Sequence, residues 1–229
     1  MAEREGRTRR LRGQTGGSCW DVALRAPDPR LRPYVVGDYC GYTERTPGVT
    51  RRREFAAPLV VAVLEFGPPL RVYAGGDPRH CARHPGGFVA GLGSGFAVCE
   101  HDGFQQGVQL NLTPVGARLV FGVPLSELAG VTPLRDLLPP RHGGLGERLQ
   151  DLADWDARFD LLDAALLDCV AAARTDTAVV SWAVRRIQDT AGALAMKSLA
   201  RELGYSHKHV IALFRDQVGV PPKLLARIV

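Results

Sequence analysis

The segment 196–215, Met-Lys-Ser-Leu-Ala-Arg-Glu-Leu-Gly-Tyr-Ser-His-Lys-His-Val-Ile-Ala-Leu-Phe-Arg, constrains the fold of this chain more than any other. In its first half, Leu199, Ala200 and Leu203 recur at the spacing of one apolar helix face. Gly204 follows, and because glycine adopts positive φ at little cost, it is suited to end a helix in a tight turn. The first half therefore predicts a short helix that stops near residue 204.

The second half of the segment predicts another helix. Ser206 is a preferred N-cap residue, and Val210, Leu213 and Phe214 have the spacing of an apolar helix face. Two such helices form either an ordinary helical hairpin or a helix-turn-helix, whose second helix enters the DNA major groove by its N-terminal half. That half carries the candidate DNA contacts Ser206, His207, Lys208 and His209. For the two histidines the alternative is a solvated helix start.

The distribution of charge favours the DNA-binding alternative. Residues 178–229 hold eight lysines and arginines against three acids, which is a net charge of +5, and this equals the net charge of the whole chain. Residues 1–177 are therefore neutral in sum. A basic terminal unit on a neutral body is typical of a DNA-binding module.

The same region resembles the DNA-binding domain of the AraC/XylS family of transcription regulators, over about residues 179–229. The resemblance is carried by Leu-Ala-Arg-Glu-Leu-Gly-Tyr-Ser at 199–206, Leu-Phe-Arg at 213–215 and Val-Gly-Val-Pro-Pro at 218–222. Gly219 is expected to end the second helix, and Pro221 and Pro222 to open the next one. The resemblance implies a bacterial, one-component regulator that binds double-stranded DNA.

Two departures from the family pattern affect the expected DNA binding. Family members usually carry two helix-turn-helix units, and this sequence stops at Val229, after the first, so it is either truncated or has half of the usual DNA-binding apparatus. The family's base-contacting positions correspond to Lys208, Ile211 and Ala212, and the last is usually arginine. Ile211 and Ala212 have only thymine methyl groups to contact, whereas Lys208 reaches guanine O6 or N7. Ile211, Ala212 and Arg215 are therefore added to Ser206, His207, Lys208 and His209 as candidate DNA-binding residues.

The composition is that of a globular protein of one or two domains. There is no run of 18 apolar residues, which predicts no membrane span, and the arginine-rich N-terminus lacks the apolar core of a secretory signal. Residues 1–16 are predicted to form a disordered basic tail, with a nucleic-acid-binding arm as the alternative. Five unpatterned cysteines predict no disulfide framework and a cytoplasmic location. The 26 arginines against three lysines suggest a high-GC bacterial genome.

Residues 17–173 are predicted to form a mixed sheet-and-helix domain, so that the whole chain is of the α+β class with a small all-α unit at 178–229. Apolar runs predict strands at 59–66 and 70–74, paired as a hairpin through Gly67-Pro68-Pro69, followed by strands at 96–99 and 107–112. Helical patterns follow at 114–122, in short pieces at 126–128 and 133–138, and at 156–173. The residues 174–177 form a polar link to the all-α unit.

This domain resembles, more loosely, the sensor half of one AraC subgroup, which implies a sensor or dimerisation role and a homodimer. The resemblance lies in Pro29–Tyr34, the glycine-rich stretch 86–91 and the residues 108–128. The apolar stripe of helix 156–173 packs either on the sheet or on a second subunit. We expect a planar apolar effector in a cavity between the sheet and helix 114–122, lined by the aromatic residues Tyr73, Phe88, Phe96 and Phe104.

The sequence contains no pattern that indicates catalysis, so the chain is expected to be no enzyme and to need no cofactor. Gly91–Gly95 lacks the form of a nucleophile elbow or of a phosphate-binding loop. His80, Cys81 and His84, with Cys99 and His101, were weighed as metal ligands, but their loop composition favours no metal. The sequence thus predicts a ligand- or partner-responsive transcription regulator. The alternative is a ligand-binding or protein-interaction module with a remnant, weakly DNA-binding helix-turn-helix.

Overall fold

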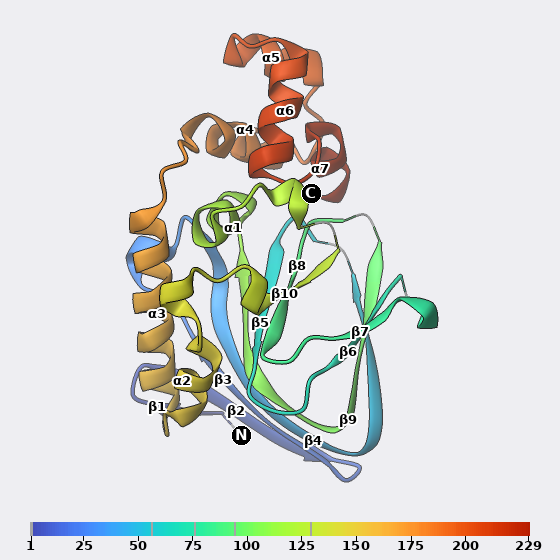
Figure 1. Cartoon of the computed structure of the whole chain (residues 1–229), viewed down its shortest axis with the longest axis vertical. Helices are drawn as coiled ribbons and strands as arrows, with labels where there is room; N and C mark the ends of the chain where they lie inside the picture. Colours follow the sequence, from blue (N-terminus) through green and yellow to red (C-terminus); the bar gives the residue numbers. More distant parts are fainter. Residues whose placement is uncertain (1, 56, 76, 94, 129) are drawn as a thin grey trace.

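A computed structural model describes residues 2–55, 57–75, 77–93, 95–128 and 130–229. In these residues the chain forms a mixed α+β structure with one large antiparallel sheet and seven α-helices. Figure 1 shows the sheet with helices along one side and a group of helices at the C-terminal end. The predicted α+β class is confirmed at this level.

The sheet has ten strands, and its main path runs β1-β2-β3-β4-β9-β5-β8-β10. The first five are β1 (Ala2–Glu5), β2 (Thr8–Thr15), β3 (Ser18–Arg25), β4 (Val35–Phe55) and β5 (Val60–Glu65). The others are β6 (Arg71–Ala74), β7 (Cys81–Arg83), β8 (Gly87–Ala90), β9 (Phe96–Leu112) and β10 (Val131–Pro133). The two longest strands, β4 and β9, pair with each other and curve together, which gives the sheet its strong bend (Figure 1).

The predicted hairpin between 59–66 and 70–74 is wrong. The segments 96–99 and 107–112 are parts of the single strand β9, and the two halves of β9 have different partners. β5 pairs with its second half and β6 with its first half, so β5 and β6 lie one after the other beside β9. Pro68 and Pro69 have no N–H to donate, and the next free amide, that of Leu70, is bound by the Glu65 carboxylate. A long strand that pairs with two short ones cannot be inferred from local patterns.

Residues 1–16 were expected to be a disordered tail, and this is wrong for the described part. β2 pairs with β3 from Arg9 to Thr15, through a turn at Gly16 and Gly17, both with positive φ. A two-glycine turn between extended segments is favoured in β-hairpins. Three arginines of this region pair with acids: Arg7 with Asp160 of α3, and Arg10 and Arg12 with Asp21 of β3. Ion pairing therefore replaces the apolar pattern that the sequence lacks here.

Three helices cover one face of the sheet: α1 (Pro114–Phe121), α2 (Leu145–Asp151) and α3 (Trp155–Ala172). Thr113 caps α1 and Pro114 opens it, as predicted. The apolar stripe of α3 packs on the sheet rather than remaining free for a second subunit, since Phe159 and Leu162 are fully buried and Phe159 stacks on Tyr39 of β4. The alternation along β5 separates two environments, because Val60 and Ala62 face these helices while Val61 and Val63 face away.

The acids of α3 fasten the helix to the sheet. Arg25, at the end of β3, is 5% exposed and donates to Asp160 at 2.9 Å and to Asp163 at 2.6 Å. Tyr39 also donates to Asp163, at 2.8 Å, and the ring of Phe159 lies 5.3 Å from the Arg25 guanidinium. A buried cation between two carboxylates fixes the position of α3 on β3 and β4.

The remaining helices are α4 (Ala178–Asp189), α5 (Met196–Leu203), α6 (His207–Gln217) and α7 (Pro222–Ile228). They form the C-terminal group in Figure 1, beyond α1. None of the helices in the described residues is both long and apolar enough to cross a membrane.

Candidate nucleic-acid interface and ligand pocket

The segment 196–217 folds into two helices that meet at a tight turn. Gly204 follows α5 with a φ of 69°, and Ser206 caps α6 by accepting a hydrogen bond from the His209 amide at 3.2 Å. At its other end α6 stops at Gly219, which has a φ of 85° and donates to the carbonyl of Phe214. Each of these local roles was predicted from the residue types.

The residues predicted to contact DNA lie on the outward side of α6. Ser206, His207, Lys208, His209, Ala212 and Arg215 are exposed, and Ile211 is half-buried. Val210 and Phe214, on the opposite side of the helix, are 2% and 1% exposed. The Tyr205 ring lies edge-on to the His209 ring at 4.6 Å, so these two aromatic side chains share the start of the helix.

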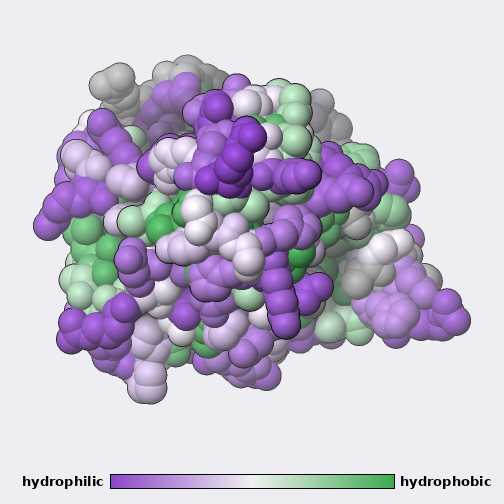
Figure 2. Space-filling view, turned by 90° about the horizontal axis from the view of Figure 1, so that it is seen from above, coloured by the Kyte–Doolittle hydropathy of each residue, from purple (hydrophilic) through white to green (hydrophobic). Residues whose placement is uncertain are grey.

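The surface around α5 and α6 is polar and rich in cations. Figure 2, which looks onto this end of the molecule, shows a largely hydrophilic face. The exposed cations of the C-terminal helices are Arg185, Lys197, Arg201, Lys208, Arg215, Lys223 and Arg227. Arg186 is instead bound to Glu202, at 3.2 Å. A helix start with free side chains and surplus positive charge is chemically suited to a polyanion.

The far end of α6 is packed on the body of the protein. α6 contacts α1 and the short helix η3 (Leu125–Glu127). Arg118 of α1 lies 3.5 Å from Asp216, and Gln217 donates to the carbonyl of Asp176 at 3.0 Å. The apolar core runs without interruption from the sheet into these helices. The C-terminal helices therefore pack on the body of the protein, although a polar link was predicted at 174–177.

A pocket with a volume of about 630 Å³ lies on the sheet face opposite the helices. Its wall is formed by strands, and no residue of α1 belongs to it. The prediction of a cavity between the sheet and residues 114–122 is therefore wrong about its position. That space is filled, because seven of the eight residues of α1 are buried. The curvature of β4 and β9, which a sequence pattern does not reveal, creates the pocket on the other face.

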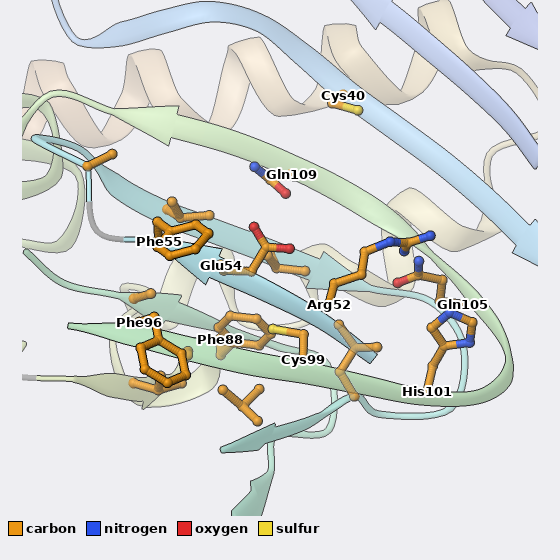
Figure 3. A pocket seen from close by; sticks show the side chains of 18 of the residues that line it. Cys40, Arg52, Glu54, Phe55, Phe88, Phe96, Cys99, His101, Gln105 and Gln109 are labelled. Carbon is orange, nitrogen blue, oxygen red and sulfur yellow. The ribbon is translucent and has the colours of Figure 1, made fainter. Parts of the chain in front are cut away.

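Of the four aromatic residues predicted to line a ligand cavity, the pocket brings together two. Phe88 and Phe96 line it, together with Phe55, at the apolar end shown in Figure 3. Tyr73 donates instead to Glu100 at 3.1 Å, and Phe104 lies under the guanidinium of Arg45 at 4.4 Å. Neither Tyr73 nor Phe104 is part of the pocket wall.

The polar end of the pocket was not anticipated from the sequence. Glu44 accepts hydrogen bonds from Arg52 and Gln105, and all three residues line the pocket. Figure 3 shows Arg52 and Gln105 at this end, near His101. Burial opposes ionisation of Glu44, but these bonds outweigh it, so the pKa of Glu44 lies below its usual value. His101 lies beside them with a side chain that is 4% exposed. The available signal was the contiguous run Arg51–Phe55, which pairs with Phe96–Glu100, but it needs the register of β4 and β9 to be interpreted.

The described residues contain no group of three histidine, cysteine or acidic side chains arranged to hold a metal ion. The histidines that the sequence offers as possible metal ligands lie in different surroundings. His80 is exposed beside Asp77, and His84 is buried against Phe88, at 6.1 Å between ring centres. All five cysteines are free thiols, and burial raises the pKa of the pocket residue Cys99 to about 12.

Comparison with known proteins gives remote structural matches. No protein-family profile matches the chain, and no curated protein matches it. Among solved structures, it is similar to Phpd with cadmium, complexed with hydroethylphosphonate (10% identity, TM-score 0.31, 94% of this chain and 50% of that one). It is also similar to a mutant of hydroxyethylphosphonate dioxygenase (11%, 0.32, 87% and 49%). A third is HEPD of Streptomyces albus with substrate 2-hydroxyethylphosphonate and Fe(II) bound (15%, 0.26, 94% and 45%).

These matches correct the prediction that the chain is no enzyme. Dioxygenases stand among the structures that it resembles, so that prediction is overturned and is carried no further. The chain spans about half the length of each matched protein. At TM-scores near 0.3 the likeness supports no argument about a reaction, a substrate or a metal.

Proposed function

We propose that this chain is a cytoplasmic, DNA-binding transcription regulator of the AraC/XylS type, in which residues 17–173 are the sensor and residues 178–229 hold a helix-turn-helix. The observation that carries the proposal is the orientation of α6. Its apolar side is buried, while the candidate contacts at its start are exposed within residues 178–229, whose net charge of +5 equals that of the whole chain. This arrangement suits insertion of the helix start into the major groove.

The candidate residues divide into base contacts and phosphate contacts. Lys208 reaches guanine O6 or N7, while Ile211 and Ala212 contact thymine methyl groups. Arg215, one turn beyond Ile211, contacts a phosphate, as do Ser206 and the two histidines. One unit with a single strong hydrogen-bonding base contact binds weakly and with steep salt dependence. A homodimer strengthens binding by placing two units on successive half-sites.

The connection between α1 and β10 supports a response to a small effector. Gly130 and Val131, at the end of this connection, line the pocket. The carbonyl of Leu128 lies against Gly91, and the carbonyl of Leu125 lies against Gly219 at the end of α6. An occupant of the pocket that shifts this connection therefore shifts the surface on which α6 rests. Such coupling is typically about 1–3 kcal/mol.

The test is a titration of labelled duplex fragments, including the DNA upstream of its own gene, at two salt concentrations. We expect one fragment to bind preferentially and the double variant Lys208→Ala/Arg215→Ala to lose that preference. The control Lys223→Ala/Arg227→Ala removes the same charge from α7 and is expected to keep the preference while weakening binding overall. Binding without sequence preference that is unchanged by Lys208→Ala/Arg215→Ala would instead favour the alternative, a ligand-binding or protein-interaction module with a remnant helix-turn-helix.

A further inference from the structure

His101 is a buried side chain whose hydrogen-bonding capacity is unused. It lies in the wall of the pocket, 4% exposed, and neither ring nitrogen has a hydrogen-bond partner. An unpaired polar group in a protein interior is destabilising, so native proteins rarely retain one without a reason. Burial lowers the pKa of His101, which keeps the ring neutral at pH 7, with one N–H donor and one acceptor nitrogen.

The neighbours of His101 determine what it offers to a ligand. Its Nε2 lies 3.5 Å from the Glu44 carboxylate, at the outer limit of a hydrogen bond, and this is the side on which a proton is favoured. With the proton on Nε2, the free nitrogen Nδ1 is an acceptor. Glu44 is itself occupied by Arg52 and Gln105. The unpaired nitrogen that His101 can offer a ligand is therefore an acceptor, Nδ1, rather than a donor.

The charges of the wall select against anions. Among the lining residues that the structure describes, Arg52 is the one arginine or lysine; it is bound to Glu44, while Glu54 adds a second carboxylate. The wall therefore carries a net negative charge. A carboxylate or phosphate ligand would meet no unpaired cation there, and it would lose its hydration on entering an apolar space.

The rest of the pocket is apolar and partly aromatic. Phe55, Phe88 and Phe96 gather at the end away from His101 (Figure 3), and Val63 and Val72 form part of the floor between the ends. The volume of about 630 Å³ is within the range of small-molecule sites. Planar rings pack well against such aromatic side chains.

We propose that this pocket binds a neutral or singly cationic aromatic molecule that donates a hydrogen bond to His101, and that it rejects anions of the same size. The proposal rests on the effector-responsive regulator described above and names the chemical class of its effector. Apolar contact provides affinity at the phenylalanine end, and the single donor at the polar end provides orientation.

The test is calorimetric titration of the full chain without DNA, using four probes of one size. 2-Naphthol has a donor, 2-methylnaphthalene has none, 2-naphthylmethylamine is a cation, and 2-naphthoate is an anion. We expect 2-naphthol to bind about 3–10-fold more tightly than 2-methylnaphthalene, the range of one neutral hydrogen bond. The amine is expected to bind comparably to 2-naphthol, and 2-naphthoate at least about tenfold more weakly.

Variants assign the preference to the named residues. In His101→Leu the preference for 2-naphthol over 2-methylnaphthalene is expected to vanish, whereas His101→Gln, which keeps an acceptor, is expected to restore part of it. The matched control is His142→Leu, which removes a buried histidine that lies outside the pocket wall and contacts Asp168 of α3, and it is expected to leave the preference intact. Should His101→Leu fail to fold, Glu44→Gln replaces it, and it is expected to bring 2-naphthoate within about threefold of 2-naphthol.

Several results would overturn the proposal: no probe binding at millimolar concentration, equal binding of 2-naphthoate, or an unchanged preference in His101→Leu. Because no DNA is present, such a failure leaves the DNA-binding result standing. Conversely, if the chain binds the probes as expected but does not recognise DNA, the proposed ligand class of the pocket stands and the proposed function as a regulator is rejected.

Discussion

Gly219 and Leu125 approach so closely that a Cβ on Gly219 would lie 2.8 Å from the Leu125 carbonyl oxygen. Gly219 also has a φ of 85°, so the position excludes side chains for two independent reasons. This contact sets the end of α6 directly on η3 and thereby on the connection that leads to the pocket.

Gly219→Ala is expected to destabilise the protein by about 2–3 kcal/mol, because it adds a steric clash to the cost of positive φ. Gly204→Ala is the matched control, since Gly204 has a similar φ of 69° but open space around it, and it is expected to cost only about 1 kcal/mol. Denaturant unfolding of both variants measures the difference. Equal losses would show that the contact with Leu125 is not tightly packed.

Arg25→Ala is expected to cost about 3–5 kcal/mol, because it leaves Asp163 with its cation removed and a side chain only 14% exposed. The control is Arg30→Ala, whose side chain is 72% exposed and pairs with Asp28, and for which a much smaller loss is expected because the pair is in contact with solvent. Urea unfolding of the two variants makes the comparison. If Arg25→Ala were as mild as Arg30→Ala, the attachment of α3 to β3 would have to reside in the apolar contacts alone.

Glu65 predicts a pH dependence of stability. Burial raises its pKa to about 7, while the Leu70 amide opposes the shift. The folded state therefore binds the proton more tightly than the unfolded chain, so this residue makes stability fall as pH rises from about 4.5 to 7. Glu65→Gln, which keeps an acceptor for Leu70, is expected to be more stable than the parent at pH 8, by on the order of 2–3 kcal/mol, and nearly equal at pH 4. A stability difference that is the same at both values would contradict the raised pKa.

Leu125 is expected to carry the coupling between the pocket and α6. If saturating 2-naphthol changes DNA affinity by about 5–150-fold, Leu125→Ala should reduce that factor towards one. The control Leu149→Ala also truncates a buried leucine, but on α2, and it is expected to leave the factor unchanged. Fluorescence anisotropy of labelled DNA, with and without 2-naphthol, measures both. A factor that survives in Leu125→Ala would place the coupling elsewhere.

The local structure of the C-terminal helices was accessible from the sequence because short-range chemistry determines it. The cap at Ser206, the positive φ of Gly204 and Gly219, and the proline start of α7 each depend on residues only a few positions apart. The same holds for Thr113 and Pro114 at the start of α1. Their pattern predicts a boundary without knowledge of the remainder of the fold.

The strand partners and the pocket depend on contacts between residues far apart in the chain. Arg52 lies opposite Cys99 only because of the register in which this part of β4 pairs with β9. His101 approaches Glu44 only because both strands curve together. Ion pairs such as Arg7 with Asp160 order an N-terminus that has no apolar pattern. Hydrophobic periodicity and capping thus determine which elements form, since they act locally. The tertiary structure alone decides which face of the sheet is filled by helices and which is left hollow, because curvature and long-range pairing have no local signature in the residues.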